Sequence, residues 1–238
     1  MTTDPLRPLL DLPGVASAVD AAREAVASVH RHPTNRRGWP ATAAEASVRA
    51  ARASAAIDGG SVDIPASGTV TDPVLAGALR VAEAIGPLLS TWERAPLQAL
   101  ARLHLLAAAD LAPSSSLGRP ATGADRLDLL AHLITGGSAV PAPILAAVVH
   151  GELLTLAPFG TADGVVARAA SRLTLIATGL DPKGLVVPEV AYLRKRDQYR
   201  ALATGFATGD IGPWLTFCCQ AITDGAREAS SIADAVIS

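Results

Sequence analysis

The sequence has few aromatic residues, few cysteines and no strong excess of charge of either sign. Aromatic side chains make up 3% of the 238 residues, which disfavours a sheet protein, because strands are rich in aromatic and β-branched residues. The two cysteines, Cys218 and Cys219, are neighbours that cannot close a relaxed disulfide with each other, so we expect a reducing compartment. A net charge of -2 lacks the basic excess that drives binding to phosphate backbones, and we expect no nucleic-acid partner.

The sequence also lacks a secretion signal and a long apolar run. Residues 1–10 contain Asp4 and two prolines where a signal peptide needs an unbroken apolar stretch. Residues 133–151, within the longest stretch without Asp, Glu, Lys or Arg, are interrupted by two glycines and two prolines, so they do not predict a continuous spanning helix. We therefore expect a cytoplasmic protein without a membrane partner.

Several common motifs of catalytic and metal-binding proteins are missing. The chain has no G-x-x-x-x-G-K-S/T loop and no G-x-G-x-x-G after a strand, which disfavours P-loop and dinucleotide enzymes. Its five histidines form no H-E-x-x-H pattern, and we expect no metal site. His150 lies among apolar neighbours in a predicted helix, which is typical of a core histidine.

Hydrophobic residues make up 50% of the chain and charged residues 18%, and alanine and leucine dominate, so the sequence predicts a globular all-α protein. Residues 31–37 are expected to form a polar loop, residues 61–70 at most a short β-hairpin, and the Ser- and Gly-rich residues 113–123 a loop. Apolar periodicity and proline or glycine boundaries predict helices over about residues 13–30, 41–58, 73–87, 96–111, 124–134, 143–156, 164–178, 188–206 and 213–237, with the last broken near Gly225.

One segment between two predicted helices carries a family resemblance. Residues 156–168 read L-A-P-F-G-T-A-D-G-V-V-A-R and resemble the signature loop of the Fic (Fido) family, H-P-F-x-D/E-G-N-G-R-x-x-R. The residues that match in register are Pro158, Phe159, Gly164 and Arg168. The resemblance implies a helical bundle in which these four residues belong to an anion- or nucleotide-binding loop, together with Asp163.

Upstream, Ser54-Ala55-Ala56-Ile57-Asp58-Gly59 resembles the inhibitory-helix motif of the same family, S/T-x-x-x-E-G/N, in an N-terminal position of the class II type. In active members the glutamate of this motif pairs with the final arginine of the loop and blocks productive ATP binding. The implied pair in this chain is Asp58 with Arg168. Residues 143–156 resemble the helix that leads into the loop, and residues 209–215 resemble the start of the closing helix.

The resemblance implies a division of the chain into three parts. Residues 1–40 are an N-terminal helical extension, residues 41–72 the inhibitory-type helix and its connector, and residues 73–238 the Fic-like helical core. The 113–123 loop falls where the family carries a flap that aligns a target segment by strand addition. The polar, serine-rich composition of this loop also fits an ordinary connector, and both readings remain open.

The signature loop departs from the family pattern where the chemistry takes place. Ala157 stands where the family has a histidine that acts as general base, and loss of such a group typically costs about 10² to 10⁴ in rate. Thr161 replaces the acid that holds Mg²⁺, and Val165 replaces a phosphate-facing arginine. Ala162 replaces a glycine. We therefore assign no catalytic residue, no metal ligand and no cofactor.

Asp163 replaces the asparagine of the signature and adds a negative charge to the loop. Two unit charges about 4 Å apart repel by roughly 4 kcal/mol at an effective dielectric of about 20, so a phosphate is disfavoured beside it. Asp163 is also expected to act as the N-cap of the next helix by accepting the amide of Val165 or Val166. Arg168 either retains affinity for a phosphate or an acidic partner, or pins the upstream helix through Asp58.

These observations predict a Fic-like protein of bacterial type whose loop is degenerate and inactive in AMP transfer, and which acts as a binding or regulatory protein. Its partner would be an unidentified protein or a second copy of the chain. One alternative is an active nucleotidyl- or phosphotransferase that uses Mg-ATP, Arg168 and a base from elsewhere. A second alternative is a helical oligomerisation scaffold, for which the Ala-rich helix over 41–58 would allow close helix association.

Overall fold

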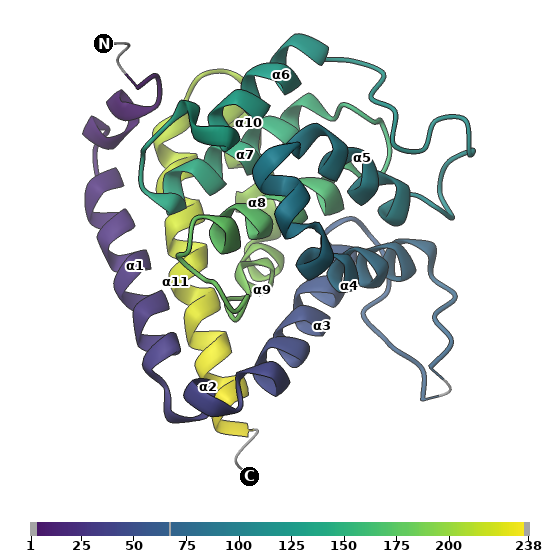
Figure 1. Ribbon diagram of the computed structural model, residues 1–238, viewed down its shortest axis with the longest axis horizontal. Helices are drawn as coiled ribbons and strands as arrows, with labels where there is room; N and C mark the ends of the chain where they lie inside the picture. The colour runs from purple at the N-terminus through teal and green to yellow at the C-terminus, as the bar shows by residue number, and fades with distance from the viewer. Residues whose placement is uncertain (1–3, 67, 236–238) are drawn as a thin grey trace.

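The computed structural model describes residues 4–66 and 68–235. Within them the chain forms eleven α-helices and no strand, which confirms the all-α prediction (Figure 1). The helices are α1 (Val15–Arg31), α2 (Pro33–Arg37), α3 (Trp39–Ile57), α4 (Pro73–Arg94), α5 (Pro96–Ala107), α6 (Ala124–His132), α7 (Ala142–Leu156), α8 (Asp163–Ala177), α9 (Pro188–Arg194), α10 (Arg196–Ala207) and α11 (Ile211–Ala235), with two short additional turns, η1 (Arg7–Asp11) and η2 (Leu133–Gly137).

Proline marks the start of several helices, as the sequence predicts. Pro73, Pro96 and Pro188 each occupy the first turn of a helix, where the missing N–H costs nothing because that group has no helical partner. Before Pro73, the Asp72 carboxylate accepts a hydrogen bond from the Leu75 amide at 2.7 Å and caps α4. The sequence therefore sets these boundaries locally, before any tertiary contact.

Helices α7 and α8 form an antiparallel pair in the middle of the molecule (Figure 1). Nearly every residue of α7 from Pro143 to Leu153 is buried, and so is every residue of α8 from Val165 to Leu175, which is the pattern of helices surrounded on all sides. Helices α1, α10 and α11 pack toward α7, whereas α4 and α5 pack toward α8. The connection between α7 and α8, residues 157–162, is therefore held at both of its ends by buried helices.

Three predictions of local structure are wrong. The 31–37 segment contains the short helix α2, because Asn35 turns inward and its side-chain amide donates to the Val29 carbonyl at 2.9 Å. The helix expected over 188–206 is interrupted at Lys195, whose backbone leaves the helical region between α9 and α10. Helix α11 runs without a break through Gly225, since this glycine is a packing contact and not a helix end. A Cβ there would lie 2.6 Å from the carbonyl carbon of Val187.

The segment over residues 61–70, for which the sequence predicts at most a short β-hairpin, contains no hairpin in the part that the structure describes. Residues 61–66 and 68–70 form an irregular connection from α3 to α4 without a strand. Pro65 cannot donate to a strand ladder, and Gly68 adopts a φ of +76°, so neither continues an extended pairing. Val62 and Ile64 remain exposed on this connection.

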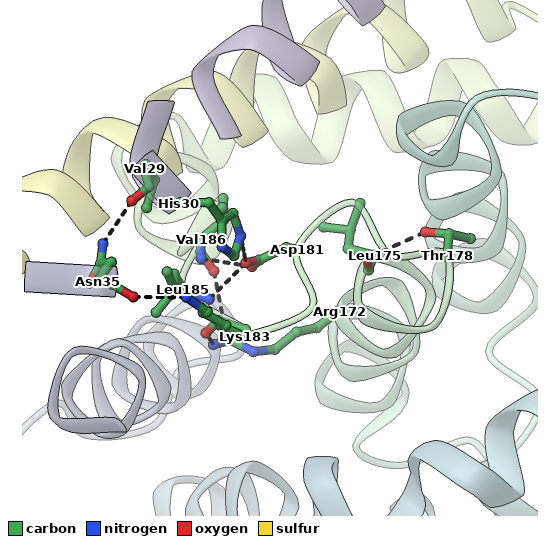
Figure 2. Close-up of polar contacts among 11 residues, drawn as sticks. Val29, His30, Asn35, Arg172, Leu175, Thr178, Asp181, Lys183, Leu185 and Val186 are labelled. Atoms are coloured by element: carbon green, nitrogen blue, oxygen red, sulfur yellow. Dashed lines mark hydrogen bonds and ion pairs between the residues drawn. The ribbon is translucent and has the colours of Figure 1, made fainter. Parts of the chain in front are cut away.

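A buried polar cluster fixes the far end of α8, as Figure 2 shows. The Asp181 carboxylate accepts the amides of Leu185 and Val186 at 3.0 and 2.8 Å and contacts His30 Nε2 of α1 at 2.9 Å. Arg172 of α8 donates to the carbonyls of Val186 and Gly184 in the same connection. The cluster ties α1 and α8 to the connection that leads into α9.

Among the described residues, α4 is the helix whose length and composition would suffice to cross a membrane. It packs against α3, α5 and α8, and its side chains from Leu75 to Trp92 that face these helices are buried. A helix in the core of a protein can have the same length and apolar composition as a helix that crosses a membrane.

Candidate functional site

The loop between α7 and α8 turns sharply at two alanines. Ala157 ends α7 with a φ of +45°, and its N–H donates to the Leu153 carbonyl at 3.1 Å. Ala162 precedes α8 with a φ of +53°. This left-handed region is uncommon for residues other than glycine, asparagine and aspartate, so both alanines are strained. Ala157 is exposed, and its side chain at the rim of the loop is a methyl group.

Asp163 does not cap α8 as predicted. Ala162 is the N-cap residue, and Asp163 is already the first helical residue. Its side chain turns back to the loop, where Oδ1 accepts the Phe159 amide at 3.0 Å. Burial raises the pKa of Asp163 and the nearby Asp58 also raises it, whereas hydrogen bonds from the amides of Phe159 and Gly160 lower it. The Asp163 carboxylate therefore accepts hydrogen bonds from amides of the loop, and not from the free amides at the start of α8.

The structure brings Asp58 and Arg168 together. Arg168 Nη2 lies 2.7 Å from Asp58 Oδ2, with the Arg168 side chain 1% exposed and that of Asp58 28% exposed. Ser54 receives two further bonds, one from Arg168 Nε to its hydroxyl at 2.8 Å and one from Nη2 to its carbonyl at 3.0 Å. The Tyr199 hydroxyl accepts from Nη1 at 3.3 Å. Burial alone lowers the pKa of Arg168, but Tyr199 and Asp58 outweigh it, and the net pKa is raised.

Asp58 is placed by the end of α3. The Gly60 amide donates to the Ala55 carbonyl at 2.9 Å and the Gly59 amide to Ala56 at 3.2 Å, which is the hydrogen-bond pattern of a Schellman motif. Gly59 has a φ of +88°, as this motif requires. The motif ends α3 at Asp58 and directs its carboxylate toward α8.

The Asp58 carboxylate also lies directly against Gly164. A Cβ on Gly164 would stand 2.6 Å from Asp58 Oδ2 and 2.8 Å from Oδ1. This is the first turn of α8, where free N–H groups and the helix dipole favour a negative charge. The Asp58 carboxylate thus lies beside the first turn of α8, close to Gly164.

Behind Arg168 lies a buried aromatic group that includes His150. His150 Nε2 and the Tyr199 hydroxyl are 2.8 Å apart, and Trp214 Nε1 donates to the Ala147 carbonyl at 2.9 Å. Burial, with a smaller effect of Arg168, holds the pKa of His150 well below its usual range, and burial raises the pKa of Tyr199 to about 12. His150 is fully buried, so a target hydroxyl at the loop cannot reach it.

His104 of α5 is part of the site, although nothing in the sequence assigned it a role. Its ring stacks on Phe159 with centroids 4.2 Å apart and planes inclined by 8°. His104 Nδ1 accepts the Gly118 amide at 2.9 Å, and Nε2 lies 3.4 Å from the Thr161 hydroxyl. Burial lowers the pKa of His104. Sequence reasoning missed it because its partners lie 14 and 57 positions away and follow no motif.

The 113–123 loop is held against the same region. The Ala121 amide donates to the carbonyl of the buried Pro158 at 2.8 Å.

Among the described residues, no group of three or more His, Cys, Asp or Glu side chains could hold a metal ion. Val165 is buried in the core, so it does not face the loop.

No protein-family model matches the sequence, and no curated protein matches it. A search of solved structures finds a crystal structure of a Fic family protein from Desulfovibrio desulfuricans G20, with a TM-score of 0.74 and 21% sequence identity. The match covers 92% of this chain and 74% of that chain. Since the helices superpose over nearly the whole chain, the protein has a Fic-like, all-α fold.

Proposed function

We propose that this protein has a degenerate active-site loop, has lost AMP transfer, and acts as a cytoplasmic binding or regulatory protein. The position that the resemblance gives to the general base is Ala157, which cannot take a proton. Two histidines lie in the neighbourhood of the loop, and both are engaged. His150 is buried with Tyr199, and His104 accepts the Gly118 amide and stacks on Phe159.

The proposal is supported by two carboxylates of the chain, which lie at the loop and at the first turn of α8, where we propose that a phosphate would otherwise bind. Asp163 accepts the loop amides, and Asp58 lies against Gly164 at the start of α8. An incoming polyanion would have to displace one carboxylate and would be repelled by both. A charge about 4 Å from a second like charge costs roughly 4 kcal/mol at an effective dielectric of about 20.

The burial and the hydrogen bonds of Arg168 also argue against the alternative of an active transferase. Each of its three nitrogens donates to a group of the protein, and its side chain is 1% exposed. To bind a phosphate, the guanidinium would have to leave Ser54 and Asp58 and carry a buried charge toward solvent. Arg168 is therefore explained as a structural link between α3 and α8, and it needs no ligand.

A transfer assay tests the proposal. The purified protein would be incubated with Mg-ATP labelled on the α-phosphate, and label on protein would be measured after separation, with Arg168→Ala as the matched variant. We expect no label above background with either protein. Labelling by the unmodified protein that disappears in Arg168→Ala would overturn the proposal in favour of an active transferase.

The proposed partner is a protein, either another chain or a second copy of this one. Light scattering across a concentration series separates these two cases. A mass that stays at 24.2 kDa would exclude self-association and leave another chain as the proposed partner, and a defined dimer or higher assembly would support self-association.

A further inference from the structure

The buried side chain of His104 contacts both the 113–123 loop and the loop at residues 157–162. We propose that His104 is a positioning residue whose neutral ring holds the 113–123 loop on the candidate site, so that the two loops form one preformed surface. This inference rests on the proposed binding function for its purpose, but its structural content is independent of any partner.

The hydrogen bonds define which tautomer His104 adopts. The Gly118 N–H donates to Nδ1, so Nδ1 carries no proton. A neutral ring then carries its proton on Nε2, which faces the Thr161 hydroxyl at 3.4 Å. One ring thus accepts from the 113–123 loop and is positioned to donate to the 157–162 loop, and its stacking on Phe159 fixes its plane.

The backbone of the 113–123 loop is shaped for this contact independently of His104. Gly118 has a φ of +71°, and a Cβ on it would lie 2.9 Å from the Ala101 carbonyl oxygen of α5. Gly123 has a φ of +74°, and a Cβ there would lie 2.6 Å from the Leu156 side chain. Only glycine allows both the backbone conformation and the close approach at these two points. The loop therefore closes onto α5 and α7 on either side of the Ala121 bond to Pro158.

A preformed loop matters for binding because ordering a flexible segment costs free energy that weakens the complex. The serine-rich sequence of residues 113–116 would by itself suggest such a cost. With Gly118 held by His104, the centre of the loop is already placed before any partner arrives.

The test compares two substitutions by hydrogen exchange. His104→Phe keeps a ring that can stack on Phe159 but has no acceptor, and His104→Asn keeps an acceptor near the position of Nδ1 but has no ring. We expect the Gly118 amide to exchange about 10-fold faster in His104→Phe than in the unmodified protein, which corresponds to the loss of one hydrogen bond, and to stay protected in His104→Asn. Amides of α7 serve as the internal reference for global stability.

Equal protection of Gly118 in His104→Phe and in the unmodified protein would overturn the inference. So would equal loss in both variants relative to α7, because packing and not the acceptor would then hold the loop. A measurement without substitution covers the case in which a variant fails to fold. Nitrogen NMR of the unmodified protein should show an unprotonated Nδ1 coupled through the hydrogen bond to the Gly118 nitrogen, and a protonated Nδ1 would contradict the inference.

These experiments use no nucleotide and no partner. If the protein transfers AMP, the proposed function is wrong, but the hydrogen bond from the Gly118 amide to His104 can still be confirmed. The inference can equally fail while the protein remains inactive, so the two outcomes are distinguishable.

Discussion

The carboxylate of Asp58 bonds to Arg168 Nη2 at 2.7 Å and at the same time lies against the backbone of Gly164, four residues earlier on α8. One side chain from the end of α3 thus neutralises the buried cation and occupies the anion-favouring first turn of the same helix. A substitution of Asp58 should therefore change both the stability of the fold and the charge beside the first turn of α8.

Removing Asp58 should destabilise the fold, because the hydrogen-bond partners that remain for the buried Arg168 guanidinium, Ser54 and Tyr199, are neutral. We expect Asp58→Ala to lower the free energy of unfolding by about 2–3 kcal/mol, below most of the range for a buried pair because Asp58 is 28% exposed. Urea unfolding measures this. Glu45→Ala, which removes an exposed partner of Arg49 on α3, is the matched control and should cost less than about 0.5 kcal/mol. Equal losses would show that the Asp58 pair contributes no more than a surface pair.

Asp163 should stabilise the loop through its hydrogen bonds to backbone amides. Asp163→Ala leaves the part-buried Phe159 amide without its acceptor, and we expect a loss of about 1–2 kcal/mol in unfolding free energy. Asp163→Asn keeps an acceptor oxygen and should lose less than half as much. Thermal unfolding of both variants checks this order, and a larger loss in Asp163→Asn than in Asp163→Ala would contradict it.

Two glycines with the same backbone conformation should respond differently to alanine. Gly118 and Gly160 have φ values of +71° and +76°, but a Cβ on Gly118 would meet the Ala101 carbonyl, whereas one on Gly160 would meet nothing within 4 Å. Gly160→Ala should therefore cost only the backbone strain, about 1 kcal/mol, and Gly118→Ala about 2–4 kcal/mol. Chemical denaturation of the pair measures the difference, and equal costs would mean that the 113–123 loop moves freely away from α5.

Acidification should destabilise the protein through its two buried histidines. The pKa values of His104 and His150 are lowered from 6.5 by burial, so the unfolded chain takes up these protons at a higher pH than the folded chain. The associated stability is complete above about pH 6.5 and is lost as the pH falls toward the folded pKa values. Urea unfolding between about pH 7.5 and about pH 5.5 should show this fall. The fall should be smaller in His104→Phe, and an identical pH dependence would contradict the role of His104.

Most of the helical framework can be read from the sequence because its boundaries are local. Proline at the starts of α4, α5 and α9 and the glycines after α3 act within one turn of chain. The errors arise where a distant contact overrides a local signal. Gly225 suggests a break, yet it is the point at which α11 meets Val187, and the polar 31–37 segment becomes helical because Asn35 bonds inward.

The candidate site divides in the same way. The resemblance pairs Asp58 with Arg168 because both residues stand in short motifs, and the structure places their side chains 2.7 Å apart. The sequence predicts Asp163 as the cap of α8, but Asp163 is the first helical residue, and its carboxylate accepts the Phe159 amide instead. His104 could not have been found, since its contacts with Gly118, Phe159 and Thr161 depend on how α5 packs beside α8.

The most direct test of the central claim, that carboxylates of the chain occupy the anion-binding positions, is calorimetric titration with Mg-ATP and with pyrophosphate. The unmodified protein should give no binding heat at millimolar ligand, and its thermal transition should not move, because a ligand at about 100 times its dissociation constant would add about 2.7 kcal/mol of stability. The double variant Asp58→Asn, Asp163→Ala should gain measurable pyrophosphate affinity. Stoichiometric binding of Mg-ATP by the unmodified protein would contradict the account.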